Sequence, residues 1–384
     1  MKKILIINST PNNHRITLQI FEKMKSEKYE LIFWINKNLK NDKNFKKPGH
    51  IIKYKKIFPL LEESQPNKRN VINNLQFTLL LPLFYLKCFF LLSFYKIFRK
   101  INSVILWGWN EKIVVSPISL ILKINTIWLQ LPNQHVLSKS KINKKIINVF
   151  SKKVSTICFS NRTKQELIKE SFPEKKINTI LPGIKLLSHE RQSNIFDSLA
   201  QADHLKSGKK FFSLGTVLEL DKNQKLEYLF QAIKNSQRII PNIQLIVIGE
   251  GSERKSLIWL TKKMEIENNV WFIGRQKYTR KWLSGFDVYV NIKEKQNLDD
   301  ITNILKAMSA GLPIIGPQNA GLDDILKDQK NCLLYNISDP EEIAGNIINL
   351  KQNFQLRKNL GKWAKEDHIN FDFNKTYSQF IKII

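Results

Sequence analysis

Short apolar runs alternate along the chain with longer segments in which apolar residues recur every three or four positions. Residues 3–8 form the first run, and residues 16–24 form the first segment with helical spacing. A short apolar run predicts a buried strand, and the three-and-four spacing predicts an amphipathic helix. Strands that alternate with helices in this way predict an α/β fold, a parallel sheet with helices on both faces.

The alternation runs through the chain twice, with a polar, irregular stretch between. The predicted strands of the first half are residues 3–8, 31–35, 51–54, 104–107, 126–129 and 156–160. Those of the second half are residues 211–214, 243–248, 270–272, 288–291, 313–315 and 332–335. Predicted helices include residues 16–24, 118–124, 139–149, 226–239, 254–264, 277–284, 340–351 and 371–384. We therefore predict two doubly wound, Rossmann-like domains, residues 1–185 and 209–365, a linker at 186–208, and a C-terminal helix in 366–384 that packs back on the first domain.

The stretch DITNILKAMSAGLPIIGPQNAG, residues 300–321, joins a short helix to a buried strand. Gly311 is expected to end the helix, because glycine tolerates the left-handed conformation and Pro313 cannot continue the hydrogen-bond pattern. The N-terminus of such a helix is a natural place to hold an anion.

Residues 75–98 are rich in Phe, Leu and Tyr and are nearly long enough to span a bilayer. Pro82, Lys87 and Lys96 interrupt this stretch, whose composition is typical of helices that lie in a membrane interface. Three interpretations remain open: two core helices broken at Pro82, an interfacial helix, or a membrane span.

The chain is strongly basic. The 384-residue chain has a formal net charge of +29, and a field of this sign attracts phosphate-rich partners such as anionic lipids or nucleotides. Lys, Asn and Ile are abundant everywhere, so a coding bias is the alternative explanation. Nucleic-acid binding is disfavoured, because aromatic residues do not interleave with the basic run at 139–153.

The cysteines and the N-terminal residues favour a cytoplasmic location. Three widely spaced cysteines, Cys88, Cys158 and Cys332, imply neither a disulfide framework nor a zinc site and fit a reducing cytoplasm. The first apolar run is too short for a signal-peptide core.

Six segments resemble the retaining glycosyltransferases of the GT-B fold, the large group 1 (family 4-like) class that includes bacterial α-mannosyl- and α-glucosyltransferases. They are FFSLGTVLELDKNQKLEYLFQAI (211–233), PNIQLIVIGEGSERKSLIWL (241–260), NNVWFIGR (268–275), FDVYV (286–290), LKAMSAGLPII (305–315) and ICFSNRTKQELI (157–168). The resemblance implies two Rossmann-like domains facing across a cleft. The N-terminal domain would bind the acceptor and the C-terminal domain the nucleotide-sugar.

In this family, a turn after the first C-domain strand and a nearby basic residue neutralise the donor diphosphate. The resemblance assigns the turn to Gly215 and Thr216 and the basic, catalytic role to Lys222. The family often has Arg where Thr216 stands, so one of two usual cations is missing. For Lys222 the alternative is a solvated loop charge.

Two further turns resemble donor-binding segments. Gly249 and Gly251 follow a predicted strand. Two explanations for glycine at these positions remain open: close approach of a nucleotide to the backbone, or a tight strand-to-helix turn. Arg275 stands where the family backbone meets the base.

One position departs from the family pattern. Family members carry two glutamates eight positions apart; the second, directly before Ala-Met, orients the donor ribose, and the first contacts the donor sugar. Here Lys306 takes the second position, and an ammonium cannot accept the ribose hydroxyl hydrogen bonds. Lys306 would instead contact a donor phosphate, and Glu294, Asp299 or Asp300 is expected to approach the vacant place.

The acceptor side offers one catalytic candidate. His135 in LPNQH follows a predicted strand, and the alternative is an exposed loop histidine. The family's glycine-rich first loop is absent, and residues 12–14 stand in its place.

We therefore expect an enzyme that transfers a hexose, with retention, from a nucleotide-sugar to a lipid-linked or polysaccharide acceptor in cell-envelope glycan synthesis. The resemblance implies no metal and no cofactor, since the leaving phosphate can act as the base in a front-face displacement. A cytoplasmic protein, peripheral at an anionic membrane, fits the basic charge. The alternative is a non-catalytic GT-B scaffold with a degenerate donor site, supported by Lys306. A nucleotide-sugar epimerase is disfavoured, because its His-Glu signature is not found in the sequence.

Overall fold

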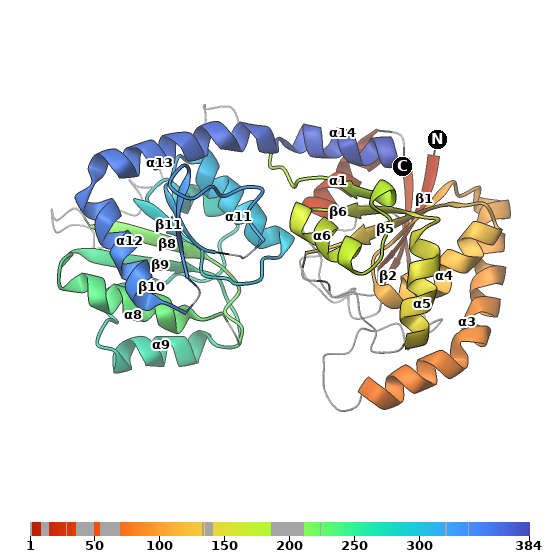
Figure 1. The fold of residues 1–384 in the computed structure, drawn as a ribbon, viewed down its shortest axis with the longest axis horizontal. Helices are drawn as coiled ribbons and strands as arrows, with labels where there is room; N and C mark the ends of the chain where they lie inside the picture. The colour runs from red at the N-terminus through yellow and green to blue at the C-terminus, as the bar shows by residue number, and fades with distance from the viewer. Residues whose placement is uncertain are drawn as a thin grey trace. The chain divides into compact units, whose positions relative to one another are not determined.

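The computed structural model describes residues 2–8, 15–27, 29–35, 50–53, 70–132, 134, 141–185, 211–222, 224–318, 321–336 and 338–384. The chain divides into two compact units, Met1–Leu181 with Tyr377–Ile384, and Pro182–Thr376. Each unit contains a parallel sheet flanked by helices (Figure 1), so the predicted α/β fold with two doubly wound domains is confirmed. The predicted linker at 186–208 lies outside the described residues.

The N-terminal unit contains a seven-stranded parallel sheet with strand order β3-β2-β1-β4-β5-β6-β7. Its strands are β1 (Lys2–Asn8), β2 (Tyr29–Ile35), β3 (His50–Lys53), β4 (Ser103–Leu106), β5 (Asn125–Gln130), β6 (Ser155–Cys158) and β7 (Ile177–Thr179). Its helices are α1 (Arg15–Ser26), α3 (Asn70–Arg99), α4 (Trp109–Ile121), α5 (Lys141–Ser151), α6 (Asn161–Lys169) and the 3₁₀ turn η1 (Glu174–Lys176). The strand order reverses between β1 and β4, as in doubly wound folds.

The C-terminal unit contains a six-stranded parallel sheet with strand order β10-β9-β8-β11-β12-β13. Its strands are β8 (Phe212–Val217), β9 (Ile243–Ile248), β10 (Val270–Phe272), β11 (Val288–Val290), β12 (Ile314–Pro317) and β13 (Cys332–Tyr335). Its helices are α8 (Leu226–Gln237), α9 (Arg254–Lys263), α10 (Thr279–Leu283), α11 (Leu298–Ser309), α12 (Pro340–Gln352), α13 (Phe354–Asp367) and the 3₁₀ turn η3 (His368–Phe371).

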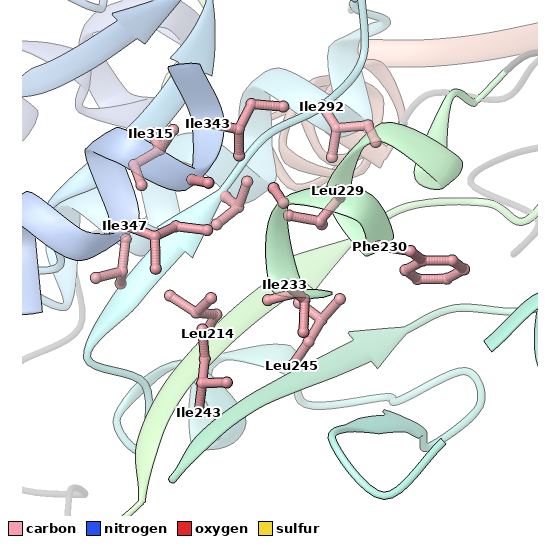
Figure 2. Packing of buried hydrophobic residues seen from close by; sticks show 14 of the residues in the cluster. Leu214, Leu229, Phe230, Ile233, Ile243, Leu245, Ile292, Ile315, Ile343 and Ile347 are labelled. Atoms are coloured by element: carbon pink, nitrogen blue, oxygen red, sulfur yellow. The ribbon is translucent and has the colours of Figure 1, made fainter. Parts of the chain in front are cut away.

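Apolar residues of the second sheet pack against α8 and α12 to form the core of the C-terminal unit. Figure 2 shows Leu214 and Leu245 of the sheet beside Ile233 of α8, with Ile343 and Ile347 of α12 completing the cluster. Because helices cover both faces, the strands are apolar on both sides, which explains their near-continuous apolar runs.

Residues 377–384 group with the N-terminal unit although they follow the other unit in sequence. They form the end of α14 (Phe373–Ile383). The Phe380 ring lies 6.4 Å from the Phe21 ring of α1, and Tyr377 Oη donates a hydrogen bond to Glu27 Oε2 over 2.8 Å. The C-terminal end of α14 thus completes the N-terminal core.

Most predicted elements are confirmed, with identical bounds for β9, β10 and β13. The strand predicted for residues 211–214 is too short, because β8 continues to Val217. Gly215 still pairs with Ile246 of β9 and with Tyr289 of β11. A glycine with hydrogen-bonded strands on both sides does not end a strand.

Two helix predictions are corrected. The alternative of two helices broken at Pro82 is wrong, since α3 runs through Pro82 as one helix. Burial of neighbours such as Leu81 and Phe84 in the core outweighs the cost of an internal proline. The helix predicted for residues 118–124 instead begins at Trp109 and ends at Ile121.

The three cysteines are free thiols and buried. Burial raises the pKa of the Cys88 and Cys332 thiols to about 12, which suppresses the reactive thiolate. We expect Ellman's reagent to react slowly with the native chain at mildly alkaline pH and rapidly with all three thiols in denaturant. Rapid stoichiometric labelling of the native chain would contradict this burial.

Candidate functional site

The strand order of the C-terminal unit reverses between β8 and β11. From this point the chain leaves β8 toward β9 and leaves β11 toward β12, so the two loops diverge. Ligands of doubly wound folds bind outside the carboxyl ends of the strands at such a reversal. The candidate site therefore comprises the loops at residues 218–222, 224–225 and 291–297.

Oppositely charged side chains of these two loops pair with each other. Lys225, after β8, forms an ion pair with Glu294, after β11, and donates a hydrogen bond to Ser338 Oγ over 3.0 Å. Both members of the ion pair are about one-third exposed, at 33% and 34%. The pair is therefore within reach of a charged ligand, and the predicted donor residue Glu294 already has a cationic partner.

A second ion pair lies deeper. Lys293 Nζ is 2.7 Å from Asp300 Oδ2, and the side chains are only 12% and 7% exposed. Burial raises the pKa of Asp300, while the Lys293 ammonium and the Asn297 N–H oppose that shift. A buried pair of this kind is costly to break, because either partner alone would be an uncompensated charge.

The N-terminus of α11 is capped by the chain itself. Asn297 Oδ1 accepts from the backbone N–H of Asp299 (2.8 Å) and of Asp300 (2.9 Å). Asp300 Oδ2 in turn accepts from the Asn297 N–H over 2.9 Å, which completes a capping box. These N–H groups of the predicted anion-binding terminus are thus already bonded.

Asp299 and Lys306 share one face of α11. Asn303 lies between them, four residues after Asp299 and three before Lys306, and Lys306 Nζ donates to Asn303 Oδ1 over 3.4 Å. All three side chains are partly exposed, whereas Asp300 faces inward. Of the carboxylates expected to approach the place of the missing glutamate, Asp299 is therefore the one on the Lys306 face. Gly311, with φ of +74°, lies beyond the Ala310 C-cap, as predicted.

A hollow lies beside Lys225, at the carboxyl ends of β11 and β13. Tyr335 Oη donates to the Asn291 carbonyl over 3.1 Å and fixes the two strand ends together. The hollow is lined by Lys225, Tyr228, Ile292, Tyr335, Ser338 and Ile343. It combines one cation and two aromatic rings with aliphatic walls.

Gly215 and Thr216 occupy positions inside β8 rather than in a turn, so the predicted turn at these two residues is wrong. A Cβ on Gly215 would lie 1.8 Å from Cε2 of Phe286. Thr216 is buried, with 2% of its surface exposed. The chain continues beside the segment after β9 as far as Leu220, and Lys222 is exposed in the turn beyond it, where its role stays a prediction.

Gly249 and Gly251 lie where the loops after β8 and β9 run together. A Cβ on Gly249 would be 1.8 Å from the Leu218 carbonyl oxygen, and one on Gly251 would be 2.2 Å from the Leu220 oxygen. Leu218 N donates to the Ile248 carbonyl over 3.0 Å, which extends the pairing past the strands. This close approach accounts for both glycines without a ligand, and their contact with a nucleotide stays a prediction.

Arg275 follows β10 and Gly274. Its guanidinium lies 4.0 Å from Glu219 Oε1 in the loop after β8, and both side chains are more than half exposed. The pair therefore links the loops at the edge of the site. Its exposure makes it a weak interaction, open to competition by a ligand.

The N-terminal unit has its own reversal, between β1 and β4. After β4, Glu111 Oε2 accepts hydrogen bonds from the N–H groups of Trp107 (3.0 Å) and Gly108 (2.7 Å). Glu111 is fully buried and fixes the start of α4. The sequence reasoning missed this residue, although an acid three positions after a possible N-cap was a readable signal.

Lys112 is an unusual buried cation beside Glu111. It donates to the Leu129 carbonyl and to Gln130 Oε1, both over 3.0 Å, and its ammonium lies 4.1 Å from the Trp109 ring centroid. No local pattern in the sequence indicates its burial, because its hydrogen-bond partners come from β5. The predicted acceptor residue His135 and the polar loop at residues 12–14 lie outside the described residues.

The family model described as glycosyl transferases group 1 matches residues 199–367. Among curated relatives, the N-acetyl-alpha-D-glucosaminyl L-malate synthase of Bacillus anthracis is 24% identical over 167 residues, 43% of this chain and 43% of the relative. The lipopolysaccharide core biosynthesis glycosyltransferase LpsE of Rhizobium meliloti is 28% identical over 127 residues, 33% of this chain and 37% of the relative. The match thus spans less than half the length of these relatives.

The fold of the whole chain is similar to that of Alr3699/HepE of Anabaena in complex with UDP. The TM-score is 0.73 at 13% identity, covering 100% of this chain and 99% of that chain. A structure of the same protein with UDP-glucose gives a TM-score of 0.70 at 14% identity, with the same coverage. Likeness at this identity shows the fold, and the predicted GT-B fold is confirmed.

The contact between Gly215 and Phe286 gives a stability prediction. Gly215→Ala should lower the free energy of unfolding by about 1–3 kcal/mol, because the new methyl group displaces the ring. In a Phe286→Leu background, the same change should lower the free energy of unfolding by a smaller amount. The control is Gly345→Ala in α12, where a Cβ meets nothing within 4 Å and is expected to be neutral or stabilising. Urea unfolding measures all four, and equal costs in both backgrounds would refute the steric explanation.

The buried ion pair gives a second prediction. Asp300→Leu should destabilise the chain by about 3–5 kcal/mol, because it leaves the Lys293 ammonium buried without its carboxylate. The double variant Lys293→Met/Asp300→Leu should recover much of that loss. Removing the exposed pair of Arg162 and Glu166 should cost less than about 1 kcal/mol. If the double variant were less stable than the single variant, burial of an unpaired charge would not be the cause.

Proposed function

We propose that this chain is a retaining glycosyltransferase, because the glycosyl transferases group 1 model matches residues 199–367. It transfers a hexose from a nucleotide-sugar donor to a lipid-linked or polysaccharide acceptor in cell-envelope glycan synthesis. The observation that carries the proposal is the set of charged loops at the β8/β11 reversal, which lies within the family-matched segment. Support for the donor class comes from Alr3699/HepE, solved with UDP and with UDP-glucose. Support for the acceptor class comes from LpsE, which is named for lipopolysaccharide core synthesis.

The donor diphosphate lies, in this proposal, over the loops after β8 and β11. Lys222 is exposed in the first loop, and Lys225 is held at the reversal by Glu294. As the bond between the sugar and the diphosphate breaks, negative charge grows on the leaving phosphate, and these ammonium groups stabilise it. A diphosphate would compete with Glu294 for Lys225, which leaves Glu294 free to accept hydrogen bonds from the donor sugar.

Donor ribose recognition must differ from the family pattern. Lys306 cannot accept hydrogen bonds, whereas Asp299 on the same helical face can accept them from two hydroxyl groups. We assign the ribose to Asp299 and a phosphate oxygen to Lys306. The acceptor hydroxyl loses its proton to the leaving phosphate in a front-face displacement, and the proposal includes no metal ion and no cofactor. His135 is the proposed acceptor-side residue.

Replacement of Lys222 tests the diphosphate assignment. Lys222→Ala should lower kcat/KM by about 10- to 100-fold, because one cation is lost where charge develops. A panel of nucleotide-sugars with membrane extract as acceptor, read by mass spectrometry, identifies the donor first. Lys358→Ala, on an exposed position of α13, is the matched control and should retain wild-type activity. Wild-type transfer by Lys222→Ala would remove Lys222 from the mechanism.

A non-catalytic scaffold is the second candidate, favoured by Lys306 at the ribose position. Calorimetric titration of the full chain with UDP, GDP and ADP separates the two. The enzyme hypothesis is supported if one nucleotide binds the wild type, binds Asp299→Asn more weakly, and binds Lys358→Ala as tightly as the wild type. Failure of all three to bind supports the scaffold.

A further inference from the structure

Helix α3 carries a continuous apolar surface on the outside of the N-terminal unit. We define the α3 stripe as Leu79, Leu83, Leu86, Phe90, Phe94, Ile97 and Phe98. Successive members are three or four positions apart up to Ile97, so they lie along one face of the helix. Each is between 51% and 71% exposed. A contiguous apolar surface of this length is uncommon on a soluble domain and marks an interaction site.

The opposite face of α3 is buried in its own domain. Leu81, Phe84, Cys88 and Leu92 belong to the N-terminal core, and the Tyr95 ring packs edge-on against Trp34 with centroids 5.2 Å apart. Figure 1 shows α3 (orange) at the edge of this unit, beside α4. The inner face therefore anchors the helix and leaves the α3 stripe outward.

This anchoring favours an interfacial helix over a membrane span. Residues Leu79–Arg99 are long and apolar enough to cross a bilayer; an 18-residue stretch among them has a mean hydropathy of 1.6, and 28% of that stretch is buried. A spanning helix needs lipid or other membrane-embedded protein on every side. Here one face packs against α4 and against apolar residues of the parallel sheet, so the geometry fits a helix that lies in the plane of an interface.

The charges beside the α3 stripe select an anionic partner. Residues 70–100 contain no Asp or Glu, while Lys87, Arg99 and Lys100 are exposed. A second copy of the chain packed through the same surface would bring these cations together. An anionic lipid surface would instead neutralise them, and the net charge of +29 adds long-range attraction to it.

We propose that the α3 stripe is a membrane-docking surface that inserts into the headgroup region of an anionic bilayer. Phe90, Phe94 and Phe98 enter the acyl boundary, and Lys87 and Arg99 contact lipid phosphates. The helix lies parallel to the membrane and holds the N-terminal unit at its surface. This docking does not depend on the chemistry proposed for the C-terminal unit.

Vesicle flotation of the purified full chain tests the proposal. Wild type should bind vesicles of phosphatidylcholine with phosphatidylglycerol, bind pure phosphatidylcholine much less, and release in high salt. The variant Leu83→Gln/Phe90→Gln/Phe94→Gln should bind at least about tenfold more weakly, because three apolar side chains no longer leave water. Lys87→Gln/Arg99→Gln should lose the preference for anionic vesicles.

The matched control changes equally exposed apolar residues elsewhere: Ile239→Gln/Trp259→Gln/Ile369→Gln. This variant should bind as wild type does. Circular dichroism and unfolding midpoints establish that all variants fold. The proposal is overturned if wild type does not float, if the stripe variant floats as wild type does, or if light scattering shows a dimer that only the stripe variant dissociates.

Discussion

The parallel pairing of β8 with β11 is the contact on which the C-terminal unit depends. It places Gly215 opposite Tyr289 and sets the Phe286 ring where a Cβ on Gly215 would otherwise lie. Because these two strands are neighbours while their onward connections run to opposite sides, their loops diverge at one edge of the sheet. The ion pairs Lys225–Glu294 and Lys293–Asp300 are positioned by that divergence and by the start of α11 next to it.

Charged side chains at this edge of the sheet form two ion pairs, one buried and one partly exposed. Lys293 and Asp300 form the buried pair, and Asp300 also caps α11 together with Asn297, so this pair supports the shape of the site. Lys225 and Glu294 form a pair that is about one-third exposed, which a ligand can rearrange at low cost. The buried pair holds the loops, and the more exposed pair is available to a substrate, although Lys293 and Glu294 are neighbours in the same loop after β11.

The two apolar faces of α3 show the same separation in the other unit. One face is buried in the domain core and is therefore not accessible for binding, while the residues of the α3 stripe are exposed and lie outside that core. The helix tolerates Pro82, because the packing of its inner face compensates for the stability lost with the missing backbone hydrogen bond. The proposed membrane docking and the proposed donor binding thus belong to different units of the chain.

The sequence by itself determined the fold class, the two-domain order and most strand positions, because buried parallel strands require apolar runs that are visible locally. It also indicated the family and the chemical departure at Lys306. Only the tertiary structure decided that Gly215 lies within a strand, that Asp300 faces inward and Asp299 outward, and that Glu111 and Lys112 are buried. Those outcomes depend on partners from distant segments, which no local pattern contains. The pairing of Lys225 with Glu294 is of this kind, since 69 positions of sequence separate two side chains that the β8/β11 reversal brings together.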